Sequence, residues 1–158
     1  MLTANNNRFY ACVTRFNNNT YFENERFREN VDFDGCVYGS PAEMPAHIPN
    51  KSRVFVFEMN NDTNQIMGIG YLYKHLNYSR KHKIYSINDY NRYCYVGKYR
   101  VDRNEIPYSY IKFLKLIETN IFKGKNHQKR GHGFNCISDV NMKHIKNKLL
   151  SWLFEVFH

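Results

Sequence analysis

The segment from residue 122 to residue 138, FKGKNHQKRGHGFNCIS, concentrates side chains that can bind an anion. It contains four Lys or Arg residues, two His and three Gly. Lys and Arg attract phosphate, and glycines leave backbone N–H groups open to a ligand. We predict a phosphate-binding loop, with a solvated basic loop as the alternative. The candidate phosphate contacts are Lys123, Lys125, His127, Lys129, Arg130 and His132.

The charge distribution along the chain supports a dedicated basic side. The formal net charge is +9 at pH 7, and the isoelectric point is about 9.4. Residues 112–148 carry nine Lys or Arg against two acids, whereas residues 1–60 carry six against seven. Such a field draws polyanions, so the expected partner is nucleic acid, either RNA or DNA.

The four cysteines predict neither a metal site nor a disulfide framework. No C-x-x-C pair occurs, and the group His127, His132 and Cys136 matches no standard zinc spacing, so we expect no metal and no cofactor. No signal peptide and no apolar run of membrane-spanning length is present. We therefore expect an intracellular, reducing compartment in which the thiols stay free.

Catalytic patterns are missing from the sequence. There is no G-x-S-x-G, no H-E-x-x-H and no Walker loop, and the acids crowd into residues 23–34 rather than forming a metal-binding group. We do not predict an enzyme. Metal-independent cleavage by Arg or His beside a phosphate is the enzymatic alternative.

Residue patterns predict alternating strands and helices around one core. Aromatic and β-branched runs indicate strands at 8–14, 53–59, 65–74 and 92–102, a short strand or a tight connection at 34–41, and a weak strand at 83–87. The run at 53–59 is almost wholly apolar, so this strand should be central, and Gly68 and Gly70 should mark a bulge or a close approach to the backbone in the strand that follows. Helical periodicity indicates helices at 21–30, 108–122 and 141–157.

These elements predict one α+β domain over residues 1–158. We expect a small curled β-barrel with about three flanking helices, because closure would protect the aromatic sheet edges. The last helix should dock on the core, with a membrane-surface anchor as the alternative. The predicted core comprises Val54, Val56, Phe57, Ile69, Leu114, Ile117 and Trp152.

The order of motifs resembles the EVE domains of the PUA-like superfamily, which are relatives of the YTH readers of methylated RNA. The matching stretches are 38–41 (YGSP), 50–52 (NKS), 68–70 (GIG), 98–101 (KYRV) and 130–138 (RGHGFNCIS). The family usually has Trp where this chain has Tyr38. The sequence also looks like uncharacterised proteins of large DNA viruses.

The resemblance implies a PUA-like fold and a concave pocket that reads a modified or flipped base. A base reader needs a flat side chain for the base face and polar groups for its edge. Tyr38 is the candidate stacking partner; the alternative is a core aromatic whose hydroxyl bonds to the backbone. Asn60 and its neighbour Asn61 could meet a base edge or could simply shape a turn. The candidate base-binding residues are Tyr38, Gly39, Ser40, Asn60, Gly70 and Tyr71.

We therefore predict a nucleic-acid-binding domain, monomeric or weakly dimeric. The alternative from another class is a structural or packaging protein of a virion, whose partners would include other virion proteins. A reader needs a concave pocket, whereas a structural protein needs an extended apolar patch.

Overall fold

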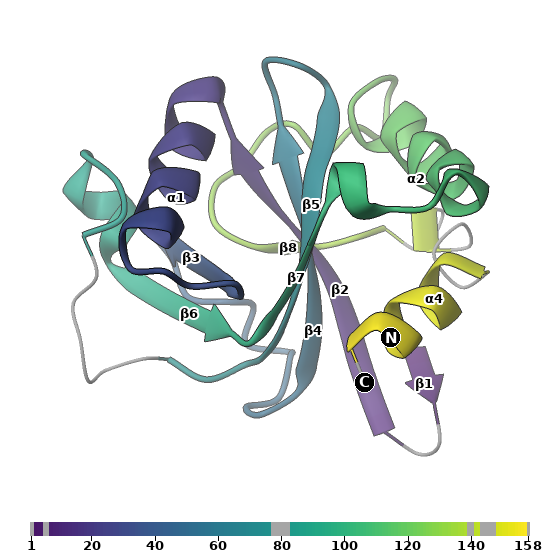
Figure 1. Cartoon of the computed structure of the whole chain (residues 1–158), viewed down its shortest axis with the longest axis horizontal. Coiled ribbons are helices and arrows are strands. Elements are labelled where there is room, and N and C mark those ends of the chain that lie inside the picture. Colours follow the sequence, from purple (N-terminus) through teal and green to yellow (C-terminus); the bar gives the residue numbers. More distant parts are fainter. Residues whose placement is uncertain (1, 5–6, 77–82, 139–140, 143–147, 158) are drawn as a thin grey trace.

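The chain forms an α+β fold in a computed structural model that describes residues 2–4, 7–76, 83–138, 141–142 and 148–157 (Figure 1). The strands are β1 (Leu2–Ala4), β2 (Asn7–Phe16), β3 (Cys36–Ser40), β4 (Arg53–Asn60), β5 (Gln65–Tyr73), β6 (Tyr93–Gly97), β7 (Tyr99–Asp102) and β8 (Asn135–Cys136). The helices are α1 (Asn18–Asn30), α2 (Tyr108–Ile121) and α4 (Lys148–Phe157), and short 3-10 turns cover Asn88–Asn91 and Arg103–Glu105. The predicted α+β class is confirmed.

Strand β4 lies at the centre of the larger sheet, as its apolar sequence predicts. It pairs with β2 in parallel and with β5 antiparallel, and every β4 residue except Arg53 is buried. The order is β1-β2-β4-β5-β7, and the short β8 also pairs with β2. A strand buried on both faces favours a continuous run of Val and Phe over an alternating pattern.

The barrel prediction is wrong for the strands that the structure describes, which form an open mixed sheet and a separate two-stranded sheet. The predicted strand at 92–102 divides at Lys98. Its first half, β6, pairs with β3, whereas its second half, β7, pairs with β5. One continuous segment thus serves both sheets instead of closing one of them.

The larger sheet separates two apolar clusters. Phe55 and Phe57 of β4 face a cluster that includes buried residues of α2 and α4. Val54 and Val56 face the opposite cluster, which includes residues of β3 and β6. Figure 1 shows α2 and α4 on one side of the sheet and α1 with the small sheet on the other.

The helices are confirmed, with two corrections. Helix α1 begins at Asn18 rather than residue 21, because Asn17 caps it and forms a capping box with Thr20. In α4 the buried stripe is Leu149, Leu153 and Phe157, spaced four residues apart. Trp152 is only partly buried and stacks on Tyr110, so it lies at the edge of the core. The residues 143–147 of the predicted last helix lie outside the described part.

The weak strand predicted at 83–87 does not form; this stretch is a bend. The Asn91 amide organises it: Oδ1 accepts bonds from the backbone N–H groups of Ile84 and Tyr85, and Nδ2 donates to the Tyr85 carbonyl at 2.7 Å. Within the described part of the chain, the helices are too short or too polar to cross a membrane.

Candidate functional site

A pocket of about 230 Å³ lies where β2 ends and α1 begins. Its walls come from segments far apart in sequence: the end of β2, the start of α1, the end of β3, the turn after β4, the bend before β6 and the basic loop. The lining residues are Thr14, Arg15, Phe16, Asn17, Thr20, Gly39, Pro41, Asn61, Tyr85, Tyr90, Lys129, Gly131, His132 and Gly133. The pocket therefore joins two of the stretches that the sequence singles out, 38–41 and 130–138.

Three aromatic side chains form one wall of the pocket. The ring centroids of Phe16 and Tyr85 are 6.5 Å apart, and those of Tyr85 and Tyr90 are 6.3 Å apart. Phe16 and Tyr85 are buried, whereas Tyr90 is 37% exposed and can meet a ligand. The Tyr85 hydroxyl accepts a 3.0 Å hydrogen bond from Asn24, which holds its ring in place.

Gly39 allows this aromatic wall to approach the small sheet. A Cβ at position 39 would lie 2.4 Å from the Tyr90 carbonyl oxygen and 3.1 Å from the Tyr85 ring. Both distances are shorter than ordinary van der Waals contact. Gly39 is thus needed for the shape of the pocket, although it offers no side chain to a base.

The basic loop forms the opposite wall, and two side chains attach it to the sheet. Arg15 of β2 donates from Nε to the Gln128 carbonyl at 2.6 Å and from Nη1 to the Gly133 carbonyl at 3.4 Å. Asn61 donates to the Lys129 carbonyl at 3.0 Å. The loop backbone is therefore anchored at positions 128, 129 and 133.

Glycines provide the backbone conformation that this loop requires. Gly131 and Gly133 have φ of +103° and +74°, a region that other residues rarely adopt. Gly133 also lies close to Ser40, because a Cβ there would be 3.0 Å from the Ser40 hydroxyl. The predicted glycine-rich loop thus packs against the end of β3.

Arg15 gives the pocket wall a positive charge, and among the described residues no carboxylate pairs with it. The ion pairs recorded among the described residues join Arg100 with Glu58 and Asp102, and Arg103 with Glu118; Arg15 takes part in none of them. Its guanidinium is partly buried, and burial lowers its pKa because desolvation disfavours the charged form. A bound anion would stabilise that charge.

The six predicted phosphate contacts divide into two groups. Lys129 and His132 line the pocket. Lys123, Lys125 and Arg130 are exposed and outside the lining. His127 is also outside the lining, and its Nδ1 accepts a 3.3 Å bond from the Lys129 backbone. The Lys129 ammonium donates to the Asn64 side chain at 2.8 Å, which holds it near the turn after β4.

Tyr38 does not face the pocket, which corrects its predicted stacking role. Its side chain is 1% exposed, and its hydroxyl donates a 2.6 Å hydrogen bond to Oε2 of Glu58. The geometry matches the core-aromatic alternative, except that the partner is a buried carboxylate and not the backbone. Burial raises the pKa of Tyr38, and the neighbouring Glu58 raises it further.

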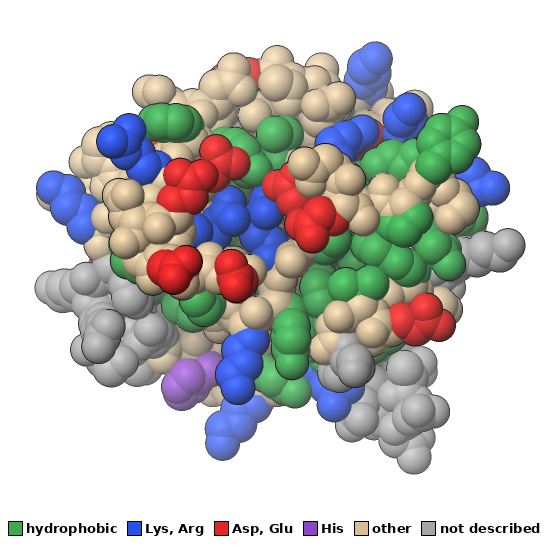
Figure 2. Space-filling view, in the orientation of Figure 1, with side chains coloured by type: hydrophobic (Ala, Val, Ile, Leu, Met, Phe, Trp, Pro, Cys, Tyr) green, Lys and Arg blue, Asp and Glu red, His purple; other side chains and the backbone are tan. Residues whose placement is uncertain are grey.

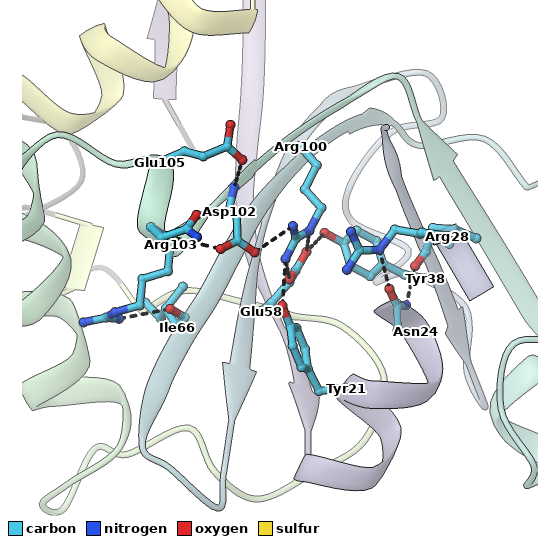
Figure 3. A network of polar contacts seen from close by, with 12 residues as sticks. Tyr21, Asn24, Arg28, Tyr38, Glu58, Ile66, Arg100, Asp102, Arg103 and Glu105 are labelled. Carbon is cyan, nitrogen blue, oxygen red and sulfur yellow. Dashed lines mark hydrogen bonds and ion pairs between the residues drawn. The ribbon is translucent and has the colours of Figure 1, made fainter. Parts of the chain in front are cut away.

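A buried polar network explains why Tyr38 lies there (Figure 3). Arg100 contacts both oxygens of Glu58, from Nε at 2.9 Å and from Nη2 at 2.7 Å, and also bonds to Asp102 and to the Tyr21 hydroxyl. The β4–β5 register shifts beside Glu58, between Phe57 and Met59. The predicted irregularity in the hairpin is therefore real, and it coincides with a buried carboxylate.

The two hairpin glycines make room for this network rather than for a ligand. A Cβ on Gly68 would lie 2.5 Å from the Arg100 guanidinium. A Cβ on Gly70 would lie 2.3 Å from the Tyr38 hydroxyl and 2.8 Å from the Cys36 sulfur. The close approach predicted from the sequence thus comes from the side chains of the protein itself, and a base-binding role for Gly70 is not supported.

The remaining base-binding candidates also have structural partners. Tyr71 packs on the opposite face of the sheet and stacks on Phe157 at 5.5 Å, so it does not border the same concavity as Tyr38. Asn60 is buried and accepts backbone bonds from residues 62 and 63, which matches the turn alternative. Ser40 is buried and bonds to Ala42.

A second hollow, of about 390 Å³, has Arg100 among its lining residues. Figure 2 shows acidic side chains around basic ones in the middle of this face. The hollow is lined by Glu25, Arg28, Glu29, Asp32, Phe33, Asp34, Arg100, Asp102 and Glu105. This acidic rim would repel a polyanion, so the two hollows differ in the partners that they favour.

Sequence reasoning missed Arg15, Tyr85 and Tyr90 as site residues. Tyr85 lies in the weak strand predicted at 83–87 and Tyr90 lies after it, whereas Arg15 directly follows the strand predicted at 8–14. The stretch 85–91 has two tyrosines among polar residues, which is more aromatic than a solvated loop usually is, and this could have indicated the site. Among the described residues, no group of three or more His, Cys, Asp or Glu could hold a metal ion.

Comparisons with protein-family models, with curated proteins and with solved structures find no match to this chain.

Proposed function

We propose that this protein binds nucleic acid, taking one unstacked base into the pocket at the end of β2 and placing flanking phosphates along the basic loop. The observation that carries the proposal is the half-buried Arg15, which has no carboxylate partner among the described residues and stands in the same pocket as three aromatic rings. Single-stranded nucleic acid requires this combination, because bases stack on aromatic faces while cations follow the backbone.

The size of the pocket suits a small planar group. Pockets for drug-sized ligands measure roughly 300–1,000 Å³, and this one is smaller at about 230 Å³. Tyr90 takes the stacking role that the sequence assigns to Tyr38, because it is the exposed ring of the wall. Lys129 and His132 stand on the other side to contact phosphate.

The resemblance to EVE domains agrees with this proposal. Two stretches that carry the resemblance, 38–41 and 130–138, lie around one pocket, as a base-reading site of the PUA-like superfamily would require. We also propose that the fold is PUA-like and that the bound base is modified or flipped out of its stack.

The test is titration of labelled single-stranded RNA and DNA at two salt concentrations, with variants matched for the group removed. Tyr90→Ala should weaken binding by about 1–3 kcal/mol, the value of one base stacked on an aromatic side chain. Tyr108→Ala is the matched control, because Tyr108 is 91% exposed and outside the pocket. Equal losses in the two variants, or no saturable binding to any strand, would overturn the proposal.

Charge is tested in the same titrations. Lys129→Met should reduce the slope of log Kd against log salt concentration by about 0.7, the value for one lost phosphate contact on a single strand. Lys115→Met removes the same charge from an exposed position of α2, outside the pocket, and should change the slope less. Equal slopes for the two variants would show that the pocket has no special electrostatic role.

A further inference from the structure

Two cysteines lie opposite each other on neighbouring strands. Cys12 of β2 and Cys136 of β8 are partners in an antiparallel pair, and their sulfur atoms are 3.9 Å apart. Directly opposed residues in such pairs have Cα atoms about 4.5–5.5 Å apart, which falls within the range of about 4.4–6.8 Å that disulfides span. The two strands therefore hold the thiols where a bond between them needs little backbone movement.

The surroundings of the two thiols differ. Cys12 is fully buried, whereas Cys136 is only partly buried. The exposed His47 lies against the outer thiol, with Nε2 3.3 Å from the Cys136 sulfur. A small reagent can thus reach Cys136 from solvent, while Cys12 lies behind it.

The hydrogen bonds distribute the protons unequally. The pKa of Cys136 is lowered to about 6: the hydrogen bond with Cys12 lowers it most, the hydrogen bond and charge of His47 lower it as well, and burial opposes both. The pKa of Cys12 is raised, because its proton bonds to Cys136 and because it is buried. The cation of Lys74 also acts on Cys12 and partly opposes that rise.

The other two cysteines lack such an arrangement. Burial raises the pKa of Cys36 to about 12 and that of Cys94 to about 11. Their thiols are therefore protonated at neutral pH and shielded from reagents. They serve as controls within the same molecule.

We propose that Cys136 is a hydroperoxide-reactive thiol and that Cys12 resolves its oxidised form into a disulfide. The Cys136 thiolate attacks one peroxide oxygen, so an S–O bond forms and the O–O bond breaks. The departing oxygen takes up the proton that left the Cys136 thiol, carried by the ring of His47, whose Nε2 lies 3.3 Å from the sulfur. Cys12 then attacks the Cys136 sulfenic acid: the S–S bond forms, the S–O bond breaks, and the hydroxide takes the Cys12 proton and leaves as water.

The step balances without any further reactant. Two thiols lose two electrons to one peroxide, and hydrogen peroxide is reduced to two water molecules. The inference does not depend on nucleic-acid binding. The disulfide would affect the basic loop, because the side chain of Gln128 donates to the Cys136 carbonyl at 3.2 Å. It would also link β8 covalently to β2.

The experiment is treatment of the reduced full-length protein with hydrogen peroxide, followed by mass spectrometry of its peptides. The expected product is a peptide pair joined through Cys12 and Cys136. In Cys12→Ser, the sulfenic acid on Cys136 has no thiol opposite it to react with. A dione reagent, which labels sulfenic acids, should therefore label Cys136 at least about tenfold more than Cys94. His47→Ala, a change at an exposed residue, should slow the oxidation while the fold is retained.

Three outcomes would overturn the inference. They are random pairing among the four cysteines, dione labelling that is equal at Cys136 and Cys94, and an oxidation rate that is the same in His47→Ala and the unaltered protein. Circular dichroism of each variant before oxidation ensures that the result reports the folded protein.

Discussion

The hydroxyl of Tyr38 donates a 2.6 Å hydrogen bond to a carboxylate oxygen of Glu58, and each of the two residues is no more than 2% exposed. This contact joins the small sheet to the large one, because Tyr38 belongs to β3 and Glu58 to β4. Arg100 completes it from β7 with two bonds to the same carboxylate. The small sheet thus bonds through Tyr38 to a buried charge pair of the larger sheet.

Replacing Tyr38 should destabilise the protein without changing the proposed binding of nucleic acid. Tyr38→Phe removes a hydrogen bond to a charged group and should cost about 1.5–3 kcal/mol of unfolding free energy. Tyr38→Ala should cost about 3–5 kcal/mol, as large-to-small changes of aromatic core residues do. Urea unfolding measures the loss, and titration of the folded protein measures the affinity. A stable Tyr38→Ala variant that binds weakly would restore the stacking role that the sequence suggests.

The Arg100–Glu58 pair should show strong coupling in a double-mutant cycle. Arg100→Met leaves the buried Glu58 without its cation and should cost about 3–5 kcal/mol. Glu58→Gln should cost less, because Arg100 keeps its bond to Asp102. The two changes together should cost less than the sum of the single losses, because neither buried charge then remains and Asp102 is partly exposed. Arg130→Met is the control, since Arg130 is exposed and its loss should stay within about 0.5 kcal/mol. Additive losses would mean that the pair is not coupled.

Gly70→Ala tests whether the glycine makes room for the network. The added Cβ would lie 2.3 Å from the Tyr38 hydroxyl, and overpacking of this kind costs about 1–3 kcal/mol. The loss should be smaller in a Tyr38→Phe background, where the hydroxyl is gone. Gly124→Ala is a useful comparison, because nothing lies within 4 Å of its Cβ position and only its φ of +82° opposes the change. Equal losses from Gly70→Ala in the unaltered protein and in the Tyr38→Phe background would show that the contact does not matter.

Local sequence patterns predicted most elements, but they could not predict strand partners. Val54 and Val56 indicated a buried central strand, and the structure confirms it. The run at 92–102 looked like one strand, yet it divides at Lys98 because its halves pair with β3 and β5. Pairing depends on segments distant in sequence, so the open arrangement could not be distinguished from a barrel by composition.

Residue types alone predict part of the site. They point to the basic loop and to Gly39, and both reach the pocket. Tyr38 was assigned to ligand binding because an aromatic residue beside glycine suits stacking, but its partner Glu58 stands in an apolar run and was not connected to it. A carboxylate in such a run needs a cation, and this requirement could have indicated Arg100.

The alkylation rate of Cys136 should depend on pH unlike that of an ordinary thiol. Because its pKa is lowered to about 6, the thiolate forms as pH rises through 6, and the rate with iodoacetamide should level off by about pH 7. The rate of a free cysteine would have its midpoint at about pH 8.5 and keep rising above it. Peptide mass spectrometry can follow the alkylation of Cys136 and Cys94 in one sample. A range from about pH 5 to about pH 9 includes the midpoint expected for Cys136 and that of a free thiol.

The charged and titratable groups around Cys136 determine how variants should move this midpoint. The hydrogen bond with Cys12 is the largest single cause of the lowered pKa and His47 adds a hydrogen bond and a charge, so Cys12→Ala and His47→Ala should each raise the midpoint. Lys74 acts on Cys12 and donates to the carbonyls of Pro45 and Ile48, so it should be left unaltered in these experiments. A midpoint near about 8.5 in the unaltered protein, or one that moves in neither variant, would show that the thiol is not activated by its neighbours.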